Sequence, residues 1–163
     1  MGRLVVLLGV LGVLTLCCLG IAAGLRSLAA EPNEIRAVLD PARVTAAAGE
    51  TFTVTLTIEN VSLDAVRVTA IGLDEALGDV LRVEATDPAF RGTRARSYPL
   101  LGAWEEYALD QRVFAGEKLP ISLTLTALQP GNVSGEVTVW VQDKLLGVSF
   151  ERARRATLNV AVR

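Results

Sequence analysis

The chain has 163 residues, no histidine, two cysteines and a formal net charge of −2. This length fits one domain of ordinary size. Without histidine the chain lacks the commonest general base and metal ligand, and because its cysteines are residues 17 and 18, the rest has no disulfide framework and no Cys/His zinc site. The near-neutral charge argues against nucleic-acid binding, which requires a strongly basic face. We therefore expect a protein that is not an enzyme, with no catalytic residues, metal, cofactor or nucleic-acid partner.

The stretch from Leu4 to Ala23 is apolar on every side and carries no charged residue. Its twenty residues, as a helix rising ~1.5 Å per residue, span about 30 Å, the thickness of the hydrocarbon core of a bilayer. A helix is required there because lipid offers the backbone no hydrogen-bond partner. We therefore predict that residues 1–30 comprise a short tail, a transmembrane helix at 4–23 that places the protein in the cell membrane, and a flank.

Two alternatives to a retained anchor remain open. Arg3, the apolar run and Ser27-Leu28-Ala29 as a cleavage site resemble a secretory signal peptide, although the run exceeds the roughly 7–15 residues usual for one. Leu14-Thr15-Leu16-Cys17 resembles a lipoprotein signal, but Leu16 stands where a small residue is expected. For a retained single-pass anchor we expect the C-terminal domain outside the cytoplasm. Long domains translocate largely regardless of charge, and a cysteine-free domain suits an oxidising exterior.

After a polar linker at residues 31–34, the dominant pattern of residues 35–163 is an alternation of apolar and polar side chains. The four long alternating runs are Thr51–Glu59, Leu119–Ala127, Glu136–Gln142 and Ala156–Arg163. The shorter strand candidates are Ile35–Leu39, Arg43–Ala46, Ala65–Ile71, Val80–Ala85, Gln111–Ala115 and Leu145–Phe150. Successive side chains of a strand point to opposite faces, so each run has one buried and one solvated face. The pattern predicts an all-β fold, a two-sheet antiparallel sandwich preceded by one N-terminal transmembrane helix.

Two stretches of the domain resemble bacterial immunoglobulin-like (Ig-like) domains. Pro41-Ala-Arg-Val-Thr-Ala-Ala-Ala-Gly49-Glu50 reads as a short strand and a Gly-acidic turn, and Thr51–Asn60 as the long strand that follows. Leu128-Gln129-Pro130-Gly131 resembles the corner between the two sheets. The similarity is to cell-adhesion-related (CARDB) and fibronectin type III-like modules. It covers roughly residues 36–72 and 118–142 and implies an Ig-like sandwich, although the tyrosine of a tyrosine corner and the Cys…Trp…Cys pattern of antibody domains are missing.

The segment Thr86–Asp110 holds most of the candidate binding residues. Its two prolines and two glycines predict a largely irregular connection, and long connections of this kind are often functional. Tryptophan, tyrosine and arginine are enriched at binding hot spots. Together with Trp140, which lies on the polar side of its run, they give as candidates Arg94, Arg96, Tyr98, Trp104, Tyr107 and Trp140. The alternative is that Trp104 and Tyr107 cover an open end of the sandwich, and that Trp140 packs beneath the long loop.

These alternatives differ in what they predict for Trp104→Ala. A binding role predicts weaker capture of a partner with little change in melting temperature. A packing role predicts a lower melting temperature.

Other polar features have both a structural and a functional interpretation. The acidic pairs Asp74-Glu75 and Glu105-Glu106 are not ready acid–base couples if extended, because neighbouring strand residues point to opposite faces. An enzyme would instead need a buried carboxylate pair, brought together by the fold, with raised pKa values. Arg152, Arg154 and Arg155 either protect a strand edge or bind an anion. Two asparagine sequons, Asn60-Val61-Ser62 and Asn132-Val133-Ser134, match the glycosylation pattern.

These observations favour a membrane-anchored, extracytoplasmic Ig-like domain with a non-catalytic binding or assembly role. Its expected partners are the membrane, through residues 4–23, and a protein or cell-wall polymer that the sequence does not identify. The alternative is a secreted, signal-cleaved β-sandwich that binds carbohydrate through Tyr98, Trp104 and Tyr107. The size of the mature protein separates the two.

Overall fold

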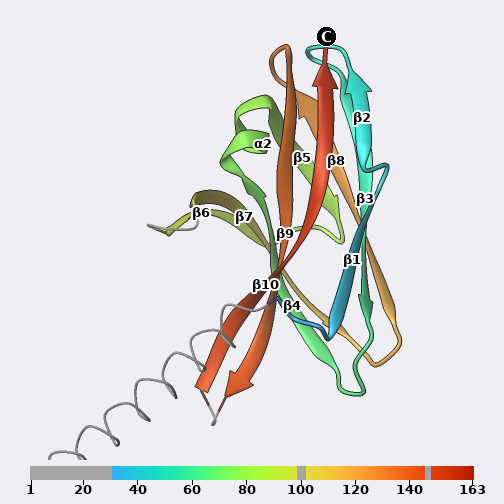
Figure 1. The fold of residues 1–163 in the computed structure, drawn as a ribbon, viewed down its shortest axis with the longest axis vertical. Helices are drawn as coiled ribbons and strands as arrows, with labels where there is room; N and C mark the ends of the chain where they lie inside the picture. The colour runs from blue at the N-terminus through green and yellow to red at the C-terminus, as the bar shows by residue number, and fades with distance from the viewer. Residues whose placement is uncertain (1–30, 99–101, 146–147) are drawn as a thin grey trace, which may run out of the picture. The chain divides into compact units, whose positions relative to one another are not determined.

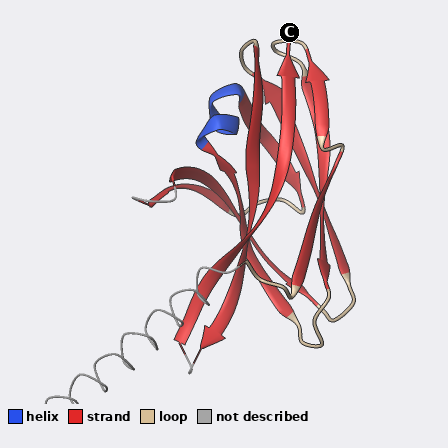
Figure 2. Ribbon diagram, in the orientation of Figure 1, coloured by secondary structure: helices blue, strands red, loops and turns tan. Residues whose placement is uncertain are grey.

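The alternating runs form two stacked β-sheets in the computed structural model, which describes residues 31–98, 102–145 and 148–163 (Figures 1 and 2). The four-stranded sheet has the order β1 (Ile35–Asp40), β3 (Thr51–Asn60), β8 (Lys118–Ala127) and β5 (Leu81–Asp87). The six-stranded sheet has the order β2 (Arg43–Ala46), β10 (Val148–Val162), β9 (Gly131–Leu145), β4 (Val66–Asp74), β7 (Gly102–Val113) and β6 (Gly92–Tyr98). Residues 31–163 form one compact unit, and the prediction of an all-β sandwich is confirmed.

The order of the strands is that of an Ig-like sandwich. In constant-type Ig domains strands A, B, E and D form one sheet and C, F and G the other. Here β1, β3, β8 and β5 occupy the A, B, E and D places, and β4, β9 and β10 the C, F and G places. The hairpin β6–β7 follows the D-type strand along the chain and widens the opposite sheet beside β4.

Both predicted turns of the Ig-like resemblance lie where the chain passes from one sheet to the other. Leu128-Gln129-Pro130 links β8 to β9, and the turn before β3 is closed by Gly49, whose φ of 84° favours glycine. The Glu50 carboxylate accepts a hydrogen bond from the Ala47 amide in this turn. One pairing departs from the predicted antiparallel arrangement, because the short strand β2 runs parallel to the end of β10.

The core lies between the sheets and is built from the apolar side of each run. Fully buried members include Val54, Leu56, Ile58, Ile71, Leu109, Ile121, Leu123, Leu125, Val137, Val139 and Leu158. Pro120, expected at a strand start or edge, is the third residue of β8, opposite Thr57 of β3 and beyond the end of β5. Its missing N–H therefore breaks no pairing with β5.

The prediction that Thr86–Asp110 is largely irregular is wrong. Most of the segment forms β6 and β7, which pair from Gly92 opposite Ala108 to Tyr98 opposite Gly102. The glycines lie at the strand starts and thus bound the hairpin. The segment lacks a clear apolar–polar alternation for two reasons. The edge strand β6 carries arginines where an inner strand would have apolar residues, and β7 buries a glutamate among its aromatic residues.

A short helix, α2 (Glu75–Val80), follows β4. Asp74 caps it, since its Oδ1 accepts a hydrogen bond from the Leu77 amide at 3.0 Å. The other oxygen, Oδ2, accepts one from the Glu136 amide of β9 at 2.7 Å. The Asp74 carboxylate therefore ties the helix to the sheet, which gives this member of the acidic pair Asp74-Glu75 a structural role.

We expect Gly135→Ala to lower the free energy of unfolding by about 1–3 kcal/mol, the usual cost of overpacking. A Cβ at residue 135 would lie 2.5 Å from Asp74 Oδ1 and 2.6 Å from Leu77 Cγ, so the helix cap must shift. Urea denaturation measures the effect. Gly131→Ala is the matched control, because no atom lies within 4 Å of its Cβ position, and equal costs for the two variants would contradict the explanation.

Residues 31–34, expected to be a polar linker, are fixed against the sandwich. Pro32 is buried, Glu31 pairs with Arg154 at 2.8 Å, and Glu34 pairs with Arg152 at 2.7 Å. Arg155 pairs with Glu136 on β9 at 3.4 Å. The run of arginines on β10 is thus matched by carboxylates, and it lies on the part of β10 that β2 leaves open, where charge discourages edge pairing.

The predicted membrane helix at 4–23 and both cysteines lie outside the described residues. Over the ranges that the structure does describe, no helix has the length and apolar character needed to cross a membrane.

Candidate functional site

The face of the six-stranded sheet that points away from the core gathers most of the candidate residues. On β9 the valines at 137, 139 and 141 enter the core, so Trp140 points to the opposite, outer face. The pairing of strands brings Glu106 opposite Gly72 and Arg94, and Trp104 opposite Arg96. We call the following set the outer-face cluster: Thr69, Arg94, Arg96, Trp104, Glu106, Trp140 and Glu151.

The two tryptophans of the outer-face cluster pack against one another. Their ring centroids are 6.3 Å apart with planes at 88°, the edge-to-face arrangement that aromatic pairs prefer. The guanidinium of Arg96 lies 5.0 Å from the centroid of Trp140. Both side chains lie against Gly72, where a Cβ would be in van der Waals contact with Trp140 Nε1 at 3.4 Å and with Trp104 Cβ at 3.6 Å. Each tryptophan is only 6% exposed, so their positions favour packing over direct contact with a ligand.

A buried carboxylate organises the arginines of the cluster. Glu106 is 1% exposed, and its two oxygens lie 2.7 Å from Arg94 Nε and 2.8 Å from Arg96 Nε. Arg96 also reaches Glu151 on β10 at 2.9 Å. Thr69, the extra residue of β4 at a bulge, donates a hydrogen bond to Glu151 at 2.7 Å. The chain of charges therefore ties the edge strand β6 across the sheet to β10.

Glu106 has a perturbed pKa. Burial raises the pKa of its carboxyl from the ordinary 4.5 to about 7, the Arg96 charge lowers it by less, and the Glu151 charge raises it further. A buried carboxylate with a raised pKa is one of the features expected of an enzyme. However, both oxygens face guanidiniums, and the side chain is closed to solvent, so the geometry favours an internal ion-pair network.

The pKa of Glu106 predicts a specific pH dependence of stability. Between pH 4.5 and about 7 the folded protein keeps a proton on Glu106 that the unfolded chain has released. This stabilising contribution is therefore complete below pH 4.5 and is lost as the pH rises through about 7. Glu106→Gln retains the shape of the protonated side chain but cannot titrate, so this loss of stability with rising pH is absent from the variant. We expect the difference in unfolding free energy to move in favour of the Gln variant across this range.

Urea denaturation at a series of pH values measures this difference. The exposed neighbour Glu105 provides the matched control, because Glu105→Gln makes the same substitution outside the buried network, and we expect the larger change with pH at Glu106. A difference that moves in favour of the wild type with rising pH would mean that the guanidiniums of Arg94 and Arg96 govern Glu106 instead of its burial.

The remaining candidate residues lie elsewhere. Tyr107 points to the opposite side of β7 from Trp104 and belongs to the core, where its ring meets Phe90 edge-on at 5.4 Å. Burial raises the pKa of its phenol well above the usual value. Tyr98 ends β6, and its side chain lies outside the described part. Of the six candidates, the fold brings together Arg94, Arg96, Trp104 and Trp140.

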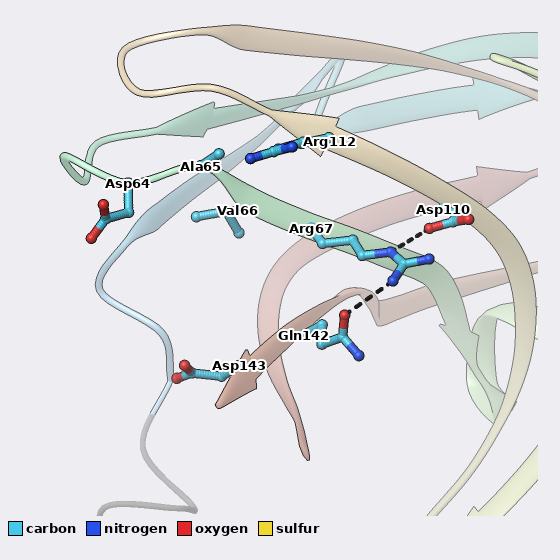
Figure 3. Close-up of a pocket in the computed structure, with 8 residues that line it drawn as sticks. All are labelled: Asp64, Ala65, Val66, Arg67, Asp110, Arg112, Gln142 and Asp143. Atoms are coloured by element: carbon cyan, nitrogen blue, oxygen red, sulfur yellow. Dashed lines mark hydrogen bonds and ion pairs between the residues drawn. The ribbon is translucent and has the colours of Figure 1, made fainter. Parts of the chain in front are cut away.

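Figure 3 shows a cavity of about 660 Å³ whose lining residue Gln142 is paired with Glu151 of the outer-face cluster on the adjacent strand. It is lined by Asp64, Ala65, Val66, Arg67, Asp110, Arg112, Gln142 and Asp143. Arg67 crosses its wall, with Nε on Asp110 at 2.5 Å and Nη1 on the Gln142 side-chain oxygen at 3.3 Å. Neither Glu106 nor Glu151 lines this cavity. The cavity wall carries both acidic and basic side chains, which suits a polar partner.

Sequence reasoning missed the carboxylates of this face. Asp110 has a φ of 59° at an irregularity where β7 has an extra residue relative to β4, and it pairs with Arg67 and Arg91. The hydrogen bond from Arg67 lowers the pKa of Asp110 below its usual range, and Arg91 contributes. Glu106 and Glu151 carried no sequence signal, because only strand pairing brings them to the arginines. Within the described ranges, no cluster of three or more His, Cys, Asp or Glu side chains is arranged to hold a metal ion.

Comparisons with known proteins concern the fold. No family model matches the sequence, and no curated protein sequence is similar to it. The structure is similar to part of E. coli alpha-2-macroglobulin (TM-score 0.49, 17% identity), covering 81% of this chain and 7% of that protein. It is also similar to a cohesin module from a Clostridium perfringens family 33 glycoside hydrolase (TM-score 0.44, 11% identity, 80% and 97% covered). A PapD-like domain of a human protein gives a TM-score of 0.41 at 13% identity, with 82% and 89% covered.

Proposed function

We propose that the chain is a single-pass membrane protein that presents its Ig-like sandwich outside the cytoplasm as a non-catalytic binding or assembly module. The observation that carries the proposal is the charge-free run Leu4–Ala23, followed directly by an independent hydrophobic core. The cysteine-free sandwich suits an oxidising exterior. Within this proposal the domain belongs with CARDB and fibronectin type III-like modules, and its partner is a protein or a wall polymer.

The contact surface in this proposal is the outer face of the six-stranded sheet around the cavity. Five strands (β4, β6, β7, β9 and β10) supply the cavity wall or the outer-face cluster, so the side chains are held by regular backbone pairing and by the Glu106 ion pairs. Such a surface binds without reorganising, which favours affinity. The carbohydrate alternative loses support, because Trp104 and Tyr107 are buried and present no open ring face for stacking.

Membrane fractionation of the full-length chain tests the anchor. We expect the intact 17.3 kDa protein in the membrane pellet after an alkaline wash, and digestion of the sandwich by protease added from outside the cell. Val13→Arg places a charge near the middle of the run and should reduce membrane recovery, since a central arginine costs about 2.5–3.5 kcal/mol of insertion energy. A soluble product that begins near Ala30 would establish the secreted alternative.

Site-specific photocrosslinking in native membranes tests the contact surface. A crosslinking residue at Arg112, in the cavity wall, should form defined adducts. The same residue at the exposed Thr53, on the outer face of the four-stranded sheet, should not. Equal adducts at both positions, or adducts at Thr53 alone, would contradict the assignment of the surface.

A further inference from the structure

The end of the sandwich at which the chain enters the domain carries a concentration of exposed apolar side chains. Five large apolar side chains are exposed among the described residues, at positions 38, 61, 63, 114 and 128. Three of them lie on two neighbouring turns, with exposed fractions of 49% for Val61, 96% for Leu63 and 56% for Phe114. Single exposed apolar residues are normal, but a group at one end of a domain marks a contact surface.

The two turns are joined by Asn60, whose side chain is fully buried. Its Nδ2 donates to the Val113 carbonyl at 3.0 Å and to the Asp64 carbonyl at 2.7 Å. Its backbone carbonyl accepts from the Gly116 amide at 2.9 Å. The turn after β3 and the turn after β7 are therefore held together, and Leu63 and Phe114 are presented in a fixed arrangement.

The position of these turns relative to the start of the domain points to what they contact. The amide of Val61 donates to the Glu34 carbonyl at 2.8 Å, so the turn after β3 adjoins the segment that leads into β1. Glu31 and Glu34 are fixed by Arg154 and Arg152. Only residues 24–30 separate this segment from the apolar run. Seven residues reach at most about 25 Å when fully extended.

We infer that Leu63, Val61 and Phe114 form a membrane-contact tip that inserts into the surface of the bilayer in which the chain is anchored. This inference rests on the anchor of the proposed function. The guanidinium of Arg112 lies 5.2 Å from the Phe114 ring centroid, an amphipathic pair suited to the boundary between acyl chains and headgroups. Asp64 and Glu117 flank the tip along with Arg112 and Lys118, so charged residues of both signs surround it. A zwitterionic lipid surface therefore suits the tip, and no anionic headgroup is invoked.

A second contact of this kind gives the domain a defined orientation. One helix allows the sandwich to rotate and tilt above the membrane, whereas a helix and an apolar tip fix two points. The outer face of the six-stranded sheet is then held at a constant angle to the bilayer.

Depth-dependent fluorescence quenching of the full-length chain tests the inference. With Cys17 and Cys18 replaced by alanine, a single probe is attached at Leu63→Cys, and the protein is reconstituted in phosphatidylcholine vesicles that contain nitroxide-labelled lipid. The matched control is Leu128→Cys, a partly exposed leucine at the opposite end of β8. We expect lipid-dependent quenching at 63 and none at 128. Adding Phe114→Ser should reduce the quenching at 63.

Other outcomes separate the tip from the anchor. Vesicle-bound protein with no quenching at 63, or with equal quenching at 63 and 128, would overturn the tip and leave the anchor intact. A probe at 63 that is shielded from water but not quenched by labelled lipid would assign the tip to a second protein surface, and would also overturn the inference. Protein that remains in the aqueous fraction would overturn both the tip and the anchor.

Discussion

Trp104→Ala is expected to lower the free energy of unfolding by about 3–5 kcal/mol, the usual range for removing a buried large aromatic side chain. Trp104 packs edge-on against Trp140, and both side chains lie against Gly72. Alanine would open a cavity that the paired strands β4 and β7 cannot close. It would also remove the packing that places Trp140 beneath Arg96. Chemical denaturation followed by circular dichroism measures the change.

Two controls distinguish this packing role from a role in binding. Leu63→Ala removes an exposed apolar side chain and should alter stability by less than about 0.5 kcal/mol. A double-mutant cycle between Trp104 and Trp140 should give a coupling of about 0.5–1.5 kcal/mol. If Trp104→Ala left the unfolding free energy unchanged but abolished partner capture, the tryptophan would be a contact residue despite its burial.

The fold was predictable from sequence wherever one side of a strand faces the core. Thr51–Glu59 and Leu119–Ala127 alternate cleanly, because β3 and β8 are central strands of a sheet with one face in solvent. The corner at Leu128–Gly131 was predictable because proline and glycine interrupt the alternation there. These local patterns are enough to identify two sheets, but they do not determine which strands pair.

The hairpin β6–β7 was not predictable by the same reasoning. Binary patterning assumes that buried means apolar, yet β7 buries Glu106 on the same face as Trp104, while Tyr107 enters the core on the other face. The carboxylate is tolerated because Arg94 and Arg96, from the adjacent strand, face its oxygens. A short stretch of sequence around Glu106 does not reveal these ion pairs, because they form only when β6 and β7 pair.

The candidate binding residues illustrate the same difference between composition and pairing. Residue types selected Arg94, Arg96, Trp104 and Trp140 as binding candidates, and strand pairing brings these four together on one face. Composition does not distinguish an exposed hot spot from a small aromatic core beneath arginines. The structure favours the second arrangement for the tryptophans and leaves the cavity beside them as the open surface.

Asn60→Ala is expected to lower the free energy of unfolding by about 3 kcal/mol, because the Val113 carbonyl and the Ser62 amide lose the Asn60 side chain, while the Asp64 carbonyl keeps its bond from the Ser62 hydroxyl at 2.9 Å. Besides its two donor bonds to Val113 and Asp64, the Asn60 Oδ1 accepts from the Ser62 amide at 3.0 Å and from the Ser62 hydroxyl at 2.8 Å. The sequon pattern pointed to a surface asparagine, whereas this side chain is fully buried.

The second sequon provides the matched control for Asn60. Asn132 is exposed, so Asn132→Ala should change the unfolding free energy by less than about 0.5 kcal/mol. Thermal and urea denaturation of both variants measure the contrast, and similar small costs would show that the turns do not depend on Asn60. Hydrogen exchange adds a local readout. The Ser62 amide donates a hydrogen bond to Asn60 Oδ1, so loss of the Asn60 side chain should speed exchange at that amide. A domain that stays folded with loosened turns would then present Leu63 and Phe114 without a fixed geometry, and in the proposed membrane contact this would loosen the orientation of the sandwich.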